Sequence, residues 1–179
     1  MRLTNRCSRS SQASFARLLG RLNGDVDGSL VATSVTFLLG LAGSGKTHRA
    51  KEIERATCAR RFDGIFGKDN AHRLNEMLSY LRDDRSCVVE EIAYCDAANR
   101  ATIIAQVRSA NPNVAVVWEC FANDLEGANW NVQNRCDPEK YNVAGHININ
   151  AYWATRYTYP EGVSPRRIFR ISRKDNEAV

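Results

Sequence analysis

Hydrophobic residues gather in three short runs, and polar, amphipathic segments separate these runs from one another. The runs cover residues 35–39, 87–94 and 114–121. Each has the length and the Val-rich or aromatic content of a buried strand. A shorter strand is expected over residues 166–171, and residues 62–70 are expected to form a loop, with a short strand there as the alternative. The hydrophobic pattern therefore predicts a sheet whose strands are distributed along most of the chain.

The segments between the apolar runs carry hydrophobic residues at helical spacing. Residues 71–82 are the clearest case, because Leu74, Met77, Leu78 and Leu81 fall on one helical face. The further helices that this spacing predicts cover residues 46–62, 97–109, 124–135 and 147–157. Strands that alternate with helices predict an α/β fold, with a mostly parallel sheet and helices on both faces in three α/β/α layers.

The turn after the first run matches the G-x-x-x-x-G-K-[ST] pattern of a phosphate-binding loop, with Gly40, Gly45, Lys46 and Thr47 at the fixed positions. Glycines let the backbone curl until successive N–H groups point at a phosphate, and the following helix directs its positive end at the same anion. We expect Lys46 to reach the β- and γ-phosphates of ATP and Thr47 to place its hydroxyl on Mg²⁺. The strand–turn–helix context predicts the fold of a P-loop NTPase. The residues expected to bind the nucleotide are Gly40, Gly43, Ser44, Gly45, Lys46, Thr47 and His48.

A P-loop also needs an acid near its Mg²⁺ ion, at the carboxyl end of a neighbouring strand. Glu90 and Glu91 lie within the second apolar run, directly after Val88 and Val89. Consecutive strand residues point to opposite faces of a sheet, so one of the two acids should face the loop. We expect it to be Glu91, which would then hold Mg²⁺ together with Thr47. The alternative is that both acids only end a strand in solvent.

Three further side chains are candidates for the chemistry of phosphoryl transfer. Asp63 or Asp69 follows the first helix, where an acid can accept the proton of an attacking hydroxyl, and we take Asp63 as the catalytic candidate. Asp69 alternatively has the position of an N-cap for the next helix. Arg135, with Lys140 beyond it, is expected to cover the transferring phosphate, as a catalytic partner of Lys46. The alternative for Arg135 is a solvated helix end, where arginine is favoured anyway.

Net charge, hydrophobic content and cysteine spacing narrow the classes of protein to which the chain can belong. The 179 residues carry a net charge of +5, which suits a phosphate-rich ligand and is compatible with a nucleic-acid partner without requiring one. No apolar run approaches the ~18 residues of a membrane span. The six cysteines form no CxxC pair and no zinc-binding spacing, so we expect reduced thiols in a cytoplasmic protein.

The first 30 residues differ from the rest of the chain. Residues 1–21 hold five arginines and no acid, and residues 24–29 have the composition of a turn or linker. We expect residues 1–30 to form a basic, weakly ordered arm and residues 31–179 to form the P-loop domain. A transit peptide and a helix packed on the domain are the alternatives for the arm.

The order of these features resembles the polynucleotide-kinase-like group of P-loop kinases, which have small nucleoside-monophosphate-kinase-type folds. The resemblance rests on the loop at residues 40–47, on the strand that ends in acids, and on the Asn-x-x-x-x-Asn-Arg pattern at Asn129, Asn134 and Arg135. It covers residues 31–171. It implies that Arg135 is a lid arginine that contacts ATP phosphates. The acid that this group carries on its second strand has no unambiguous counterpart, so the general base and the acceptor stay open.

The leading functional prediction is an ATP-dependent phosphotransferase. It would move the γ-phosphoryl group of ATP·Mg²⁺ to a hydroxyl of a nucleotide, a nucleic-acid end or a small metabolite. One alternative is an ATPase in which Glu90 and Glu91 activate water. Another is a nucleotide-binding module without catalysis, which the lack of an unambiguous base would explain.

Overall fold

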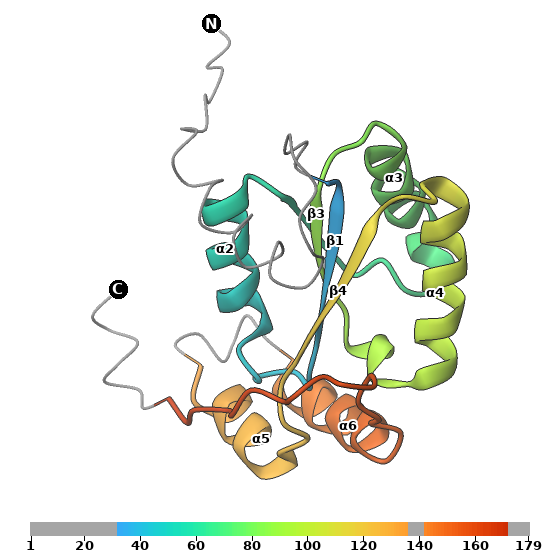
Figure 1. Cartoon of the computed structure of the whole chain (residues 1–179). Coiled ribbons are helices and arrows are strands. Elements are labelled where there is room, and N and C mark those ends of the chain that lie inside the picture. Colours follow the sequence, from blue (N-terminus) through green and yellow to red (C-terminus); the bar gives the residue numbers. More distant parts are fainter. Residues whose placement is uncertain (1–31, 136–141, 172–179) are drawn as a thin grey trace, which may run out of the picture.

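The computed structural model describes residues 32–135 and 142–171 (Figure 1). The expectations for the basic arm and for Lys140 lie outside these residues. In the part of the chain that the structure describes, no helix is long and apolar enough to cross a membrane.

Four parallel strands form the central sheet. They are β1 (Ser34–Leu39), β2 (Arg60–Asp63), β3 (Cys87–Glu90) and β4 (Ala115–Cys120), and their order in the sheet is β2-β3-β1-β4. β1 is central, and its Phe37 pairs with Val89 of β3 on one side and with Trp118 of β4 on the other. The prediction of an α/β fold with a parallel sheet is confirmed.

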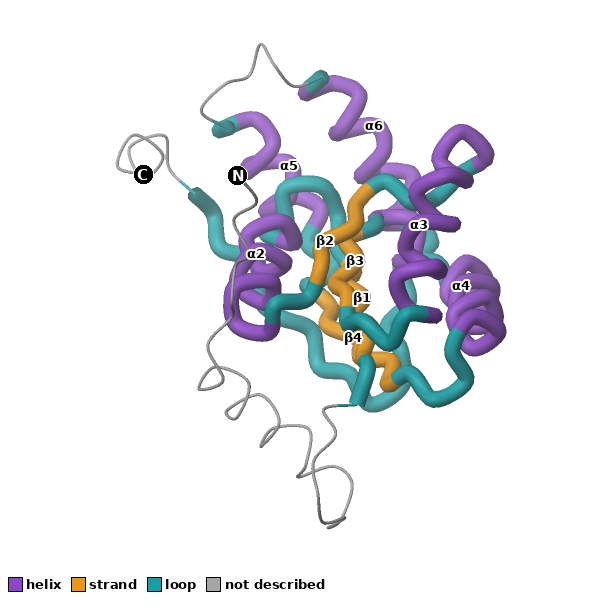
Figure 2. The backbone as a smooth tube through the Cα atoms, turned by 90° about the horizontal axis from the view of Figure 1, so that it is seen from above, coloured by secondary structure: helices purple, strands orange, loops and turns teal. Residues whose placement is uncertain are grey.

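Helices cover both faces of this sheet. The helices are α2 (Lys46–Thr57), α3 (Ala71–Arg82), α4 (Ala97–Ala110), α5 (Leu125–Gln133) and α6 (Val143–Ala154), with the short 3₁₀ helices η1 (Lys68–Asn70) and η2 (Ile92–Cys95). α2 lies on one face, and α3 and α4 lie on the other (Figure 2). α5 and α6 lie at the end of the sheet where β1 runs into the P-loop (Figure 1). The sheet and its helices therefore form the three predicted layers, and α5 and α6 border the loop.

Alternating residues of the strands divide the core between the two faces. Phe37 stacks on Trp118 with 4.6 Å between ring centroids and meets the edge of Tyr94 at 5.5 Å, on the side of α3 and α4. On the opposite face, Leu38 and Val88 pack with Ala50 and Ile53 of α2. Because side chains alternate along a strand, the position of Val88 against α2 determines the face to which the next residues of β3 point.

Several element boundaries differ from those that the sequence predicts. α2 ends at Thr57 rather than near residue 62, because Cys58 adopts a left-handed conformation with φ 58° and closes the helix. α6 begins at Val143 instead of residue 147, where the Asn142 side chain accepts a hydrogen bond from the Gly145 N–H. Asp69 lies inside η1, so its expected position as an N-cap is wrong.

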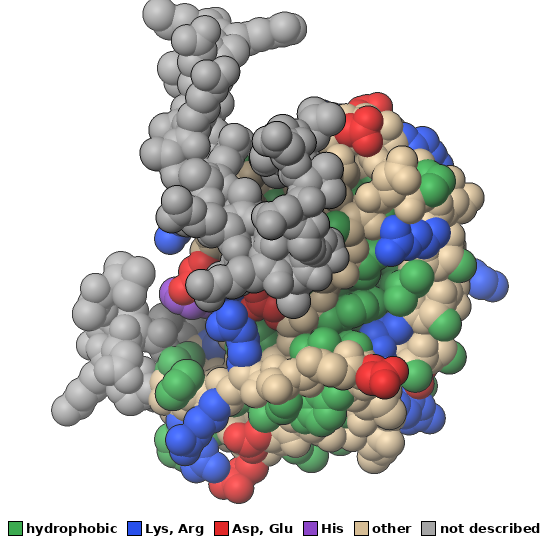
Figure 3. Space-filling model, viewed as in Figure 1, with side chains coloured by type: hydrophobic (Ala, Val, Ile, Leu, Met, Phe, Trp, Pro, Cys, Tyr) green, Lys and Arg blue, Asp and Glu red, His purple; other side chains and the backbone are tan. Residues whose placement is uncertain are grey.

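The last predicted strand is also shorter than expected. Residues 166–171 form only one parallel bridge, between Arg166 and Phe121 at the end of β4. β4 itself is half-buried over most of its length. On the face of the molecule that Figure 3 shows, apolar side chains are exposed near the middle of the described surface, and Lys and Arg side chains lie around them.

The cysteines fall into two groups among the described residues. Cys87, Cys95 and Cys120 are free and buried, and burial raises the pKa of each thiol, to about 12 for Cys87. Cys58 is disulfide-bonded, so the expectation of reduced thiols is wrong for this residue. It is exposed and directly follows the last residue of α2.

Candidate nucleotide-binding site

The glycines of the loop occupy positions where a side chain does not fit. Gly43 has φ 87° and Gly45 has φ 102°, both in the left-handed region. A Cβ atom on Gly43 would lie 2.3 Å from the Ala128 carbonyl oxygen of α5, and one on Gly40 would lie 2.4 Å from Ser44 Oγ. The loop is therefore packed tightly against α5 and against itself.

The N-terminus of α2 is open toward the loop. Its N-cap is Gly45, which has no side chain to cap the helix, and the Arg49 N–H donates to the Gly45 carbonyl oxygen at 3.1 Å. The N–H groups of Lys46, Thr47 and His48 precede this bond and point out of the first turn. Together with the positive end of the helix dipole, they favour an anion in front of α2.

The Lys46 side chain lies along the inside of the loop. Its Nζ donates hydrogen bonds to the carbonyl oxygens of Gly40 at 2.6 Å and of Leu41 at 2.9 Å. Burial lowers the pKa of Lys46, while the nearby Cys95 and Glu90 groups oppose the shift. Because burial disfavours the charged form of this half-buried side chain, an approaching phosphate oxygen would stabilise the ammonium group strongly.

Glu90, not Glu91, is the acid that faces the P-loop threonine. The Thr47 hydroxyl donates a 2.6 Å hydrogen bond to Glu90 Oε2. Glu90 follows Val88 by two residues and therefore points to the same face of the sheet, toward α2. The expectation that Glu91 faces the loop is wrong, because β3 presents the other face at that point.

Glu91 instead holds backbone groups beyond the end of β3. Its carboxylate accepts hydrogen bonds from the Ala93 N–H at the start of η2 and from the Phe66 N–H, both at 3.3 Å. Glu91 thus fixes the segment that follows β3 to the loop that follows β2. Both of its carboxylate oxygens are engaged in these contacts.

The Thr47 hydroxyl and the Glu90 carboxylate fit a Mg²⁺ ion. The Glu90 side chain is only 6% exposed, and its ion-pair contact with Arg61 is long, at 3.4 Å from Nη1 to Oε1. Among the described residues, no hydrogen bond reaches Glu90 Oε1, although this atom is buried. Within residues 32–135 and 142–171, no three His, Cys, Asp or Glu side chains gather around a point that a metal ion would occupy. A Mg²⁺ ion here would take its other ligands from phosphate and water.

A cleft of about 470 Å³ opens in front of the loop and collects most of the predicted residues. Its lining consists of Ala42, Gly43, Gly45, Lys46, Thr47, Asp63, Asn131, Arg135, His146 and Ile171. Lys46 and Thr47 therefore share one cleft with Asp63 and Arg135, although these residues come from three distant parts of the chain. Asp63 also forms a 3.1 Å ion pair with Arg73 of α3, at the exposed edge of the site.

The two histidines near the loop have different surroundings. The His48 side chain is 83% exposed and lies 3.3 Å from Glu52, outside the cleft lining, so only its backbone N–H is placed to bind a nucleotide. His146 of α6 lines the cleft and was not predicted. Desolvation lowers its pKa, and the positive charges of Arg135 and Lys46 lower it further. These effects favour a neutral imidazole in the cleft.

Two asparagines anchor the first half of the loop, and neither was singled out by the sequence pattern. Asn150 of α6 is fully buried. Its Oδ1 accepts a hydrogen bond from the Ala42 N–H at 2.7 Å, and its Nδ2 donates to the Ala42 carbonyl oxygen at 3.0 Å. The same Nδ2 also donates to Asn129 Oδ1 at 2.9 Å. One side chain thus satisfies both backbone groups of Ala42.

Asn131 makes the second anchor from α5. Its Nδ2 donates to the carbonyl oxygens of Gly43 at 2.9 Å and of Phe169 at 2.8 Å, while its Oδ1 accepts from the Ile171 N–H at 2.8 Å. Asn131 therefore joins the P-loop to the C-terminal segment of the described chain. This contact explains how Ile171 comes to line the cleft.

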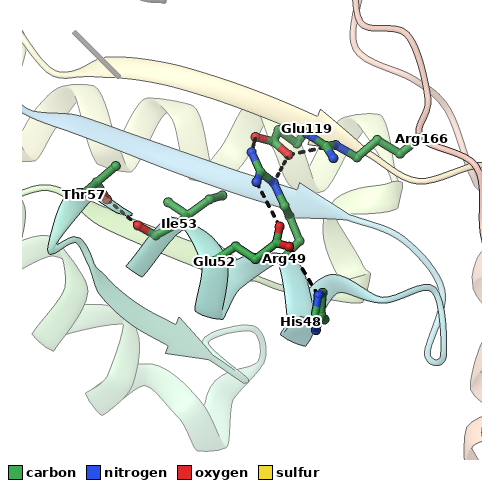
Figure 4. A network of polar contacts seen from close by, with 7 residues as sticks. All are labelled: His48, Arg49, Glu52, Ile53, Thr57, Glu119 and Arg166. Atoms are coloured by element: carbon green, nitrogen blue, oxygen red, sulfur yellow. Dashed lines mark hydrogen bonds and ion pairs between the residues drawn. The ribbon is translucent and has the colours of Figure 1, made fainter. Parts of the chain in front are cut away.

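An ionic network holds the first turn of α2 against the sheet. Glu119 of β4 accepts two 2.7 Å hydrogen bonds from Arg49 and lies 3.0 Å from Arg166 (Figure 4). Arg49 also reaches Glu52 of its own helix at 3.0 Å. The hydrogen bond to Glu119 raises the pKa of Arg49 above its usual range. The network connects α2, β4 and the C-terminal segment behind the phosphate-binding loop.

The fold and this loop together define a P-loop α/β protein. The sequence matches no protein-family model and none of the curated proteins. Solved structures with a similar course of the chain include a gluconokinase from Sinorhizobium meliloti 1021, with 12% identity over 82% of this chain and 88% of that chain, at a TM-score of 0.43. The protein APE1195 is 18% identical over 79% of this chain and 87% of its own, with a TM-score of 0.48.

A third similar structure comes from the PezAT chromosomal toxin–antitoxin system of Streptococcus pneumoniae. It is 16% identical, covers 94% of this chain and 82% of its own length, and has a TM-score of 0.49.

Proposed function

We propose that this chain is an ATP-dependent phosphotransferase of the P-loop kinase type. The observation that carries the proposal is the single cleft in which Lys46 and Thr47 of the loop lie together with Asp63 and Arg135. A phosphate-binding loop alone would suit any nucleotide-binding protein. A carboxylate and an arginine at the edge of the same cleft supply the two further groups that transfer to a hydroxyl requires.

Each residue has a distinct part in the proposed reaction. The hydroxyl oxygen of the acceptor attacks the γ-phosphorus, the bond to the β–γ bridging oxygen breaks, and ADP leaves with that bonding pair. Lys46 exchanges its carbonyl partners for phosphate oxygens, and Arg135 neutralises charge that develops on the transferred group. Asp63 accepts the proton of the attacking hydroxyl. Thr47 and Glu90 would hold Mg²⁺ when it is bound, and the ion would neutralise charge on the phosphates.

Hydrolysis of ATP is the second candidate, because Glu90 is a buried acid next to the P-loop threonine. Glu91 is occupied by two backbone N–H groups, so it is not available to activate water. Glu90 accepts the Thr47 hydrogen bond through Oε2, and its Oε1 receives no hydrogen bond from the described residues, so Glu90 is the acid that hydrolysis would use. A binding module without catalysis is the third candidate.

The class of the acceptor is part of the proposal, because the resemblance to polynucleotide-kinase-like enzymes leaves the acceptor open. The proposed acceptors, in the cytoplasm, are a nucleotide, a nucleic-acid 5′ end or a small metabolite with a hydroxyl group. The experiment that tests the function is transfer of label from γ-labelled ATP, with Mg²⁺, to pooled acceptors of these classes. Label on one pool supports the proposal. Free phosphate at the same rate with and without acceptor would instead establish an ATPase.

The two consecutive acids give a paired prediction. Glu90→Gln should raise the Mg²⁺ concentration needed for half-maximal ATP binding about tenfold, because it removes a carboxylate beside the metal. Glu91→Gln should change that concentration less than twofold, since this side chain contacts backbone N–H groups instead. Mg²⁺ titrations of a fluorescent ATP analogue measure both values. A larger shift for Glu91→Gln would contradict the orientation that the structure shows.

A further inference from the structure

A second, smaller pocket lies on the α3 and α4 side of the sheet. Its volume is about 170 Å³. The loop after β2, the start of α3, the 3₁₀ helix η2 and one face of α4 form its walls. The lining residues are Ile65, Phe66, Gly67, Ala71, Leu74, Tyr94, Asn99, Thr102, Ile103 and Gln106.

Among the described residues, no charged side chain lines this pocket. Phe66 and Tyr94 supply aromatic walls whose planes meet at 85°, with 6.4 Å between ring centroids. Besides the Tyr94 hydroxyl, the neutral polar side chains of the lining are Asn99, Thr102 and Gln106, which lie on the same face of α4. The pocket therefore combines aromatic surfaces with amide and hydroxyl groups on one side.

The pocket and the phosphate cleft share the loop that follows β2. Asp63 lines the cleft, and Ile65, two residues later, lines the pocket. The Phe66 N–H is held by Glu91, whose neighbour Glu90 accepts the hydrogen bond of Thr47. A molecule seated in the pocket therefore lies next to the segment that carries the proposed general base.

We propose that this pocket binds the uncharged heterocyclic ring of a nucleoside-type acceptor, whose hydroxyl then points toward Asp63. This inference rests on the proposed phosphotransferase function and names the acceptor of that same site. A ring with amide-like edges can pack on Phe66 and Tyr94 and exchange hydrogen bonds with the polar face of α4. A carboxylate or phosphate in the same place would lose its hydration without a charged partner in the lining.

The volume sets a limit on what enters. Sites for drug-sized ligands usually measure roughly 300–1,000 Å³, so a space of about 170 Å³ suits one ring system and not a dinucleotide. A free nucleoside and the terminal nucleotide of a 5′-hydroxyl oligonucleotide present the same ring to the pocket. Separate assays with each of them distinguish these two sources of one chemistry.

The test fills the pocket from its exposed edge. Thr102→Trp adds a large side chain at a surface position of α4 that lines the pocket, and Ala105→Trp adds the same side chain at an exposed position of α4 outside the lining. Acceptor KM is measured for nucleosides, 5′-hydroxyl oligonucleotides, nucleoside monophosphates and a sugar acid, together with the Kd for ATP. Thr102→Trp should raise the KM for the nucleoside-type acceptor about tenfold or more, whereas Ala105→Trp should not. Neither variant should change the Kd for ATP by more than about twofold.

The outcomes distinguish failure of the pocket proposal from failure of the proposed phosphotransferase function. Transfer only to the sugar acid, or a KM that Thr102→Trp leaves unchanged for every acceptor that carries the ring, overturns the inference while the phosphotransferase function stands. Absence of transfer to every acceptor overturns the proposed function. In that case nucleoside binding is measured directly by calorimetry, and binding that Thr102→Trp removes and Ala105→Trp keeps supports the pocket. Equal binding by both variants, or no binding by the unmodified chain, overturns it.

Discussion

Replacing Lys46 with alanine should lower phosphoryl transfer at saturating ATP at least about a hundredfold. The ammonium group is the one side-chain cation in the loop itself, and its loss removes about 3 kcal/mol of stabilisation from the charge that develops on the phosphates. The fold should be retained, because Nζ contacts only the carbonyl oxygens of Gly40 and Leu41 within the loop. Steady-state transfer from labelled ATP and thermal melting measure the two effects.

Lys51→Ala is the matched control, since Lys51 is exposed on the same helix. It should leave both transfer and melting temperature unchanged. The pH dependence of stability gives a second readout for Lys46. Its lowered pKa means that the unfolded chain binds this proton more tightly, so stability increases as pH rises from the lowered value toward 10.5. Lys46→Ala should lack that increase. Normal turnover of Lys46→Ala would rule out the proposed role of the loop.

Replacing Asn150 with alanine should lower the free energy of unfolding by about 3 kcal/mol. Asn150 is fully buried and makes three hydrogen bonds, two of them to the backbone of Ala42. The substitution leaves a cavity and removes the partner of two part-buried backbone groups, each of which costs about 1–3 kcal/mol if water does not replace the bond. Urea unfolding followed by circular dichroism measures the change.

Asn148→Ala provides the comparison, because Asn148 is exposed on the same helix. It should change the free energy of unfolding by less than about 0.5 kcal/mol. Asn150→Ala should also weaken ATP binding at temperatures where the variant is still folded, since the first half of the loop loses its anchor. A stability loss for Asn150→Ala no larger than for Asn148→Ala would contradict this account.

Much of the architecture could be predicted from the order of apolar and polar residues. The strands around Phe37, Val89 and Val117 lie where continuous apolar runs occur. For Phe37 and Val89 the reason is that both faces of the sheet are buried there, whereas β4 around Val117 is half-buried. The P-loop was predictable because the local backbone conformation requires its glycines. A Cβ atom on Gly43 would clash with α5, and Gly45 has φ 102°, which favours glycine.

The site was predictable only in part, because it depends on contacts between distant segments. The choice between Glu90 and Glu91 depends on which face of β3 meets α2, and the alternation of Val88 with its neighbours contains that information. The anchoring role of Asn150 leaves no such signal. The residue lies in an apolar helix, and it becomes important only because α6 brings it to Ala42, 108 positions earlier in the chain. His146 reaches the cleft through the same helix.

The adjacent acids at the end of β3 have a consequence for how two ligands affect each other. Glu90 contacts Thr47 at the phosphate cleft, and Glu91 holds the backbone of Phe66 in the wall of the second pocket. One peptide bond thus separates the side chains that border the two sites. If nucleotide binding moves Glu90, the peptide bond transmits the movement to Glu91, which is hydrogen-bonded to the backbone of Phe66. The affinity of the second pocket for its ligand then changes. Thermodynamic linkage then requires that an occupant of the pocket change the affinity for the nucleotide by the same factor.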